Sequence, residues 1–220
     1  MVQYTNVLET AKNNFQTGIG KNYSPADVEE VWKQVAQFIR SSLLKKRAVD
    51  IKGLGRFTIQ EYSMPVSSIY AVWSHRPVFY LDKRLCDSYH IKCVRLFSSD
   101  KISVVSTNLS TIAALTNLSR HAVEDIINEV VQALCRLCMA QKDLELPLPG
   151  LGTLRIVDRY TDMRYSRELV RAVHRDIADP LVMASHVRAC DKRPPPRASF
   201  LAPVAVPPRY LRELHDVNYG

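Results

Sequence analysis

The chain has 220 residues, of which 46% are hydrophobic and 24% are charged. This composition is typical of folded proteins and excludes a wholly disordered or fibrous chain. The length accommodates one large domain or two of about 100 residues each, and no run of about 20 apolar residues predicts a membrane span. The 30 basic and 22 acidic residues give a net charge of +8, which predicts an acidic partner such as nucleic acid, an anionic membrane or an acidic protein surface.

The first part of the chain predicts a short helix followed by a long one. The short helix is expected over residues 5–15, with Thr5 or Asn6 as its cap. The long helix begins after Ser24, because Ser is a favoured capping residue and Pro25 suits the first helical position. Apolar residues follow at helical spacing up to about residue 43.

The residues after the long helix predict a β-hairpin. Polar and apolar residues alternate before and after the tripeptide Gly53-Leu54-Gly55, which is typical of two strands joined by a tight turn. A returning strand is expected over residues 77–81, and a short helix over residues 82–89.

The second half of the chain repeats this order. A helix expected over residues 108–116 precedes a long helix capped by Ser119, and the same tripeptide recurs at residues 150–152 between two alternating stretches. A tight return and a helix over residues 166–177 follow. The recurrence indicates an internal duplication, in which the structural turn glycines are Gly53, Gly55, Gly150 and Gly152.

The composition changes after Cys190, because six of the 12 prolines lie in the last 30 residues. We therefore expect a first domain over residues 1–94, a linker over 95–103, a second domain over 104–190 and an extended proline-rich tail over 191–220. Whether the tail is ordered without a partner stays open. Its candidate contact residues are Phe200, Tyr210, Leu211 and Leu214.

Two helices, a hairpin with a Gly-x-Gly-x-Phe turn at residues 53–57, a returning strand and a short helix resemble the HU/IHF superfamily of DNA-architectural proteins. The tandem pair is similar to the eukaryotic HU-like family of coiled-coil domain-containing protein 81. The resemblance implies an α+β fold of two tandem HU/IHF-like domains that pair as an intrachain pseudo-dimer. It also implies protein binding at centrosomes and cilia.

In HU-like proteins a long β-arm carries cations into the minor groove of DNA. The corresponding stretch here, from Phe57 to Ser74, contains no Lys or Arg, although phosphate contacts require them. This absence favours an arm that packs on protein, and a DNA-binding arm is the alternative. The candidate arm contacts are Pro65, Ile69, Tyr70 and Trp73.

The positive charge is concentrated in the first domain, since residues 1–95 carry 14 basic and 8 acidic residues. We interpret the cations near the end of the first long helix and the hairpin turn as a basic patch that faces an acidic protein surface, for which tubulin is suitable. A solvated helix end is the alternative interpretation. The candidate patch consists of Arg40, Lys45, Lys46, Arg47, Lys52 and Arg56.

The five cysteines predict neither a disulfide framework nor a metal site. Their odd number favours reduced thiols, and the pair Cys135 and Cys138 lacks the second pair that a zinc site needs. Cys86, His90 and Cys93 have a spacing that places them on one helical face, but no fourth ligand is near them in sequence. We expect no cofactor and no metal.

These observations predict a non-enzymatic structural or adaptor protein of a microtubule-based assembly, such as a ciliary axoneme or a centrosome. Its expected partners are tubulin or microtubule-associated proteins, and its expected location is the cytoplasmic cytoskeleton. No phosphate-binding loop, nucleophile elbow or metalloprotease motif is present. The alternative function is an architectural DNA-binding protein in the nucleus.

Overall fold

The computed structural model describes residues 4–14, 22–65, 71–93 and 102–175, all within a compact unit that spans residues 1–179. No helix in these ranges has the length and apolarity to cross a membrane. Several predictions lie outside the described residues: the tail with Phe200, Tyr210, Leu211 and Leu214, the candidate arm contacts Ile69 and Tyr70, and the side chains of Pro65 and Trp73.

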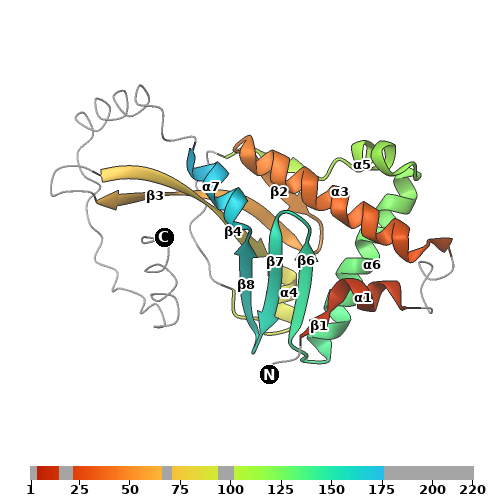
Figure 1. Ribbon diagram of the computed structural model, residues 1–220. Helices are drawn as coiled ribbons and strands as arrows, with labels where there is room; N and C mark the ends of the chain where they lie inside the picture. Colours follow the sequence, from red (N-terminus) through yellow and green to blue (C-terminus); the bar gives the residue numbers. More distant parts are fainter. Residues whose placement is uncertain (1–3, 15–21, 66–70, 94–101, 176–220) are drawn as a thin grey trace. The chain divides into compact units, whose positions relative to one another are not determined.

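The fold is a mixed α+β arrangement of two repeats with two small sheets (Figure 1). The first repeat contains β1 (Thr5–Asn6), α1 (Val7–Lys12), α3 (Pro25–Leu44), β2 (Ala48–Ile51), β3 (Gly55–Pro65), β4 (Ala71–Leu81) and α4 (Lys83–Ser88). The second contains β5 (Val104–Ser106), α5 (Leu109–Thr116), α6 (Arg120–Met139), β6 (Leu144–Leu148), β7 (Gly152–Val157), β8 (Tyr160–Tyr165) and α7 (Arg167–Arg175).

The helix starts that the sequence predicted are confirmed by their caps. The Asn6 side chain accepts a hydrogen bond from the Leu8 amide at 2.9 Å, and Ser24 forms a reciprocal capping box with Asp27. The Ser119 hydroxyl accepts from the amide of Ala122 at 3.1 Å. α3 and α6 both have 20 residues, but Gly53 comes nine positions after the end of α3 and Gly150 eleven positions after the end of α6. The second repeat is therefore two residues longer between its long helix and its glycine turn.

The glycine turns join β2 to β3 and β6 to β7, as the alternation predicted. Gly55 and Gly152 have φ angles of 142° and 149°. A Cβ atom on Gly55 would collide with the carbonyl oxygen of Tyr80, and one on Gly152 with that of Arg164. These glycines allow the neighbouring strand to approach closely, which no other residue permits.

Strands β3 and β4 extend beyond the rest of their sheet as a two-stranded ribbon (Figure 1). β2 pairs with β3 only over residues 55–57, whereas β3 and β4 stay paired as far as residues 65 and 71. The returning strand begins six residues earlier than the expected start at Pro77, because the pairing with β3 continues past the alternating segment. In the second repeat β7 and β8 are joined by a turn at residues 158–159.

The two repeats exchange short strands. β1 of the first repeat pairs in parallel with β6 of the second, and β5 of the second repeat pairs in parallel with β2 of the first. The short helices follow the same rule, since α1 packs against α6 and α5 packs against α3. The strands β1 and β5 were not predicted from the sequence. The buried apolar residues of both repeats form one cluster, with Trp32, Phe57, Ile126 and Leu146 fully buried.

Candidate protein-interaction surface

The segment that connects α3 to β2 carries three consecutive cations. Lys45, Lys46 and Arg47 are all exposed, and Lys46 has a left-handed φ of 55° that ends the helix. None of the three forms an ion pair with another described residue. We call residues 45–47 the basic loop; its cations are free to contact a partner.

The other predicted patch residues near the hairpin lie at the opposite end of β2. Lys52 is exposed in the glycine turn. Arg56 is 4.0 Å from the carboxylate of Asp50 on the neighbouring strand. The structure therefore divides five of the six residues of the predicted patch into two groups separated by the length of β2. The charge of Arg56 in the second group is partly offset by Asp50.

Arg40 belongs to neither group, because it contacts the second repeat. Its guanidinium is 3.7 Å from the carboxylate of Glu168 at the start of α7, and it lies beside the turn at Gly150. The side chain is 38% exposed, and its Nε is buried without a hydrogen-bond partner among the described residues. Arg40 thus joins α3 to α7. Unlike the cations of the basic loop, it is not free to contact a partner protein.

The described part of the ribbon offers no free cation to a phosphate. Arg76 donates hydrogen bonds to the side-chain oxygen of Gln60 at 3.0 and 2.8 Å and lies over the ring of Tyr62. His75 is 3.4 Å from the carboxylate of Glu61. The polar side chains at this level of the ribbon are therefore occupied by their cross-strand neighbours.

Helix α7 of the second repeat packs against the ribbon through His174. The Nδ1 atom of His174 is 2.8 Å from the Ser74 hydroxyl, and its Nε2 atom is 3.5 Å from the hydroxyl of Tyr62. The two rings meet edge to face with centroids 6.4 Å apart. Sequence reasoning missed this contact, because about 100 residues separate the partners and the expected helix over 166–177 gave no sign of what it would cover.

Comparison with protein families agrees with this architecture. The model of CCDC81 eukaryotic HU domain 1 matches residues 5–93, and that of CCDC81 eukaryotic HU domain 2 matches residues 103–176. The chain belongs to the CCDC81 family of tandem HU-domain proteins. The two matches follow one another along the chain and together cover most of it, as the resemblance in the glycine turns predicted.

One prediction about the cysteines of this CCDC81-family chain is wrong. Cys86 and Cys93 form a disulfide, whereas the sequence favoured reduced thiols and one helical face. The helix α4 ends at Ser88, and His90 takes a left-handed φ of 52°. The amide of Ile91 then donates to the carbonyl of Cys86 at 3.0 Å, so the chain turns back and brings the two cysteines together.

The other described cysteines, Cys135 and Cys138, lie on α6 and pack against the apolar core. Burial raises the pKa of the Cys138 thiol to about 12. Burial also raises the pKa of Cys135, although a hydrogen bond with Tyr89 opposes this effect. Both thiols stay protonated near neutral pH, which makes them poor nucleophiles. The described residues contain no group of three His, Cys, Asp or Glu side chains that could hold a metal ion.

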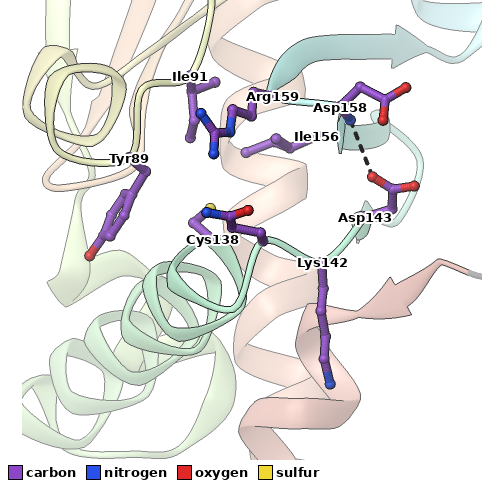
Figure 2. A pocket seen from close by; sticks show the side chains of 9 residues that line it. Tyr89, Ile91, Cys138, Lys142, Asp143, Ile156, Asp158 and Arg159 are labelled. Atoms are coloured by element: carbon purple, nitrogen blue, oxygen red, sulfur yellow. Dashed lines mark hydrogen bonds between the residues drawn. The ribbon is translucent and has the colours of Figure 1, made fainter.

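A cavity of about 300 Å³ lies where the disulfide loop of HU domain 1 meets the end of α6 (Figure 2). Figure 2 shows the Arg159 side chain directed toward Ile91, and the Asp143 carboxylate accepting a hydrogen bond from the amide of Asp158. The lining contains two cations and two carboxylates and so favours no ligand charge: Tyr89, Ile91, Cys138, Gln141, Lys142, Asp143, Ile156, Asp158 and Arg159.

Proposed function

We propose that this protein is a non-enzymatic structural or adaptor protein that binds acidic surfaces of other proteins in a microtubule-based assembly, such as a cilium or a centrosome. The observation that carries this proposal is the basic loop, whose three exposed cations have no anionic partner among the described residues. Unpaired exposed cations contribute to association by attracting a surface of the opposite charge.

The ribbon supports a protein partner over DNA. An HU-type DNA complex needs cations along the arm, because phosphate contacts supply most of the affinity that does not depend on sequence. The stretch from Phe57 to Ser74 has none, and Arg76 at its end is bound to Gln60 and Tyr62.

The microtubule context follows from the resemblance to a family associated with centrosomes and cilia, together with the charge of the candidate partner. Tubulin is acidic, so it complements a surface on which Lys45, Lys46 and Arg47 are free. The half-buried, neutral cysteine thiols and the mixed charges of the cavity give no support to a catalytic role.

A paired experiment separates a protein partner from DNA. We expect the full chain to pellet with microtubules at physiological salt and to give no shift of a duplex DNA probe. Replacing Lys45, Lys46 and Arg47 together with Ala should weaken pelleting about tenfold or more, since each exposed contact to an acidic surface is lost.

The matched control removes the same charge elsewhere, by replacing the exposed residues Lys33, Arg167 and Arg171 with Ala. This control should pellet like the unmodified chain, and circular dichroism should show both variants to be folded. Tight DNA binding with a steep salt dependence, and no pelleting, would instead identify the HU-like architectural function that the net charge of +8 also suits.

A further inference from the structure

Strand β5 leaves one edge of its sheet without a partner in the described part of the chain. The strand order is β4-β3-β2-β5, so β5 pairs with β2 on one side only. The amide of Ala48 donates to the carbonyl of Ser103 at 2.9 Å. In a parallel ladder with this register, the N–H and C=O groups of Val104 and Ser106 point away from β2. Unpaired edges of this kind are templates for an added strand.

The basic loop lies at the beginning of this free edge. β2 follows Arg47 directly, and its first residue, Ala48, is in register with Val104. Because the two strands are parallel, Ser103, just before β5, lies beside Ala48 at the end of the basic loop. The free backbone groups and the free cations therefore lie at the same end of the sheet, on β5 and at the start of the neighbouring strand β2.

Two exposed apolar side chains flank the same place. Val104 is 48% exposed, and Leu44, which immediately precedes Lys45, is 39% exposed. Most other large apolar side chains of the described residues are buried in the core. An extended segment with alternating acidic and apolar residues would meet all three features, with its backbone on the edge, its apolar side chains near Val104 and Leu44, and its carboxylates near the basic loop.

We propose that the free edge of β5 and the basic loop bind an extended acidic segment of a partner protein as an added β-strand. The proposal rests on the proposed function, which it deepens by naming how the acidic partner is held. Backbone pairing supplies the affinity, and the charge of the basic loop selects an acidic sequence over a neutral or basic one.

The probe is a fluorescein-labelled peptide in which Glu and Val alternate, and the control peptide has the same charge but Pro in place of each Val. Pro removes the amide that a strand must donate. Fluorescence anisotropy with the full chain should show at least about tenfold tighter binding of the Glu-Val peptide, the ratio that corresponds to about 1.4 kcal/mol. Hydrogen exchange should slow at the amides of Val104 and Ser106 when this peptide binds.

Variants of the chain test the edge of β5 and the basic loop separately. Val104→Pro removes one outward-facing amide, while its bonded neighbours keep their ladder with β2, and it should weaken binding about tenfold. Val104→Ala keeps that amide and should change binding by less than about threefold. Replacing Lys45, Lys46 and Arg47 with Ala should weaken binding and flatten its salt dependence.

The outcomes distinguish the added strand from the acidic contact. Equal binding of both peptides, lost in the triple variant, would overturn the added strand and leave the acidic partner intact. If neither peptide binds, the added strand is overturned, and the microtubule pelleting described above decides separately whether the proposed function holds. Slow exchange at Val104 and Ser106 in the unbound full chain would show that the chain covers this edge itself, and would also overturn the proposal, whether or not Val104→Pro folds.

Discussion

The indole Nε1 of Trp32 in the first repeat donates a 2.8 Å hydrogen bond to the carbonyl oxygen of Pro147 in the second. Trp32 is fully buried, and Pro147 lies in β6, the strand that also pairs with β1. The bond therefore joins the long helix of one repeat to the sheet of the other inside their common core.

Replacing Trp32 with Phe should lower the free energy of unfolding by about 2 kcal/mol or more. The change leaves the partly buried carbonyl of Pro147 without its donor and removes part of a fully buried ring. Urea denaturation measures the effect. The neighbouring variant Lys33→Ala, which breaks only an exposed ion pair with Glu30, should stay within about 1 kcal/mol of the unmodified chain. Equal losses for the two variants would contradict this assignment.

Replacing Gly55 with Ala should destabilise the protein by about 3 kcal/mol or more, because a Cβ would strike the Tyr80 carbonyl oxygen at a φ of 142°. Gly150→Ala is the matched comparison. Its φ of 74° is also left-handed, but the nearest atom to a new Cβ is Nη1 of Arg40 at 3.8 Å. That variant should lose about 1 to 2 kcal/mol. Thermal unfolding of both variants checks the order, which would be contradicted if Gly150→Ala were the less stable.

Stability should fall as the pH rises above about 8.5. The thiol of Cys138 has its pKa raised by burial to about 12, whereas in the unfolded chain it ionises near its ordinary value of about 8.5. Between these values the unfolded chain loses a proton that the folded chain keeps, so alkali favours unfolding. The contribution is complete below about pH 8.5 and is lost as the pH approaches 12.

Urea denaturation between about pH 8 and 11 tests this dependence. Cys138→Ala should show a shallower decline than the unmodified chain. Met139→Ala, at an exposed and non-ionisable neighbouring position, should keep the original slope. Parallel curves for the unmodified chain and Cys138→Ala would show that the thiol does not carry the effect.

The chain should be a monomer of about 25.0 kDa in solution. Each repeat already receives a strand and a short helix from the other, so the two repeats satisfy one another within one chain. Light scattering coupled to size-exclusion chromatography measures the mass. An obligate particle of twice this mass would contradict an intrachain pseudo-dimer.

Features that depend on a few neighbouring residues were predictable from the sequence. Ser24 and Ser119 mark the starts of the two long helices, and the two Gly-Leu-Gly tripeptides mark the hairpins, because caps and positive φ angles have strong local residue preferences. The duplication gave these signals twice, which supported the HU-like fold.

Features that depend on distant partners were not predictable in this way. β1 and β5 have two and three residues, too few for a recognisable alternation, and they exist because the other repeat offers an edge. The contact of His174 with Ser74 has no local signal. Cys86 and Cys93 have helical spacing, but the helix stops between them. The run of cations at residues 45–47 could be recognised in the sequence. The sequence did not show that Arg40 contacts Glu168 and is separate from this run.

The exchange of strands between repeats has a consequence for synthesis on the ribosome. The sheet of the first repeat is incomplete until residues 104–106 have been made, and β1, at the beginning of the chain, has no sheet to join until residues 144–145 appear. Neither repeat can therefore complete its sheet before the contributing strand of the other repeat has been synthesised. Because the two repeats are separate parts of one chain, a substitution in one repeat does not change the sequence of the other. The two repeats can therefore acquire different structures. One such difference is the long ribbon of β3 and β4 in the first repeat, where the second repeat has a tight turn between β7 and β8.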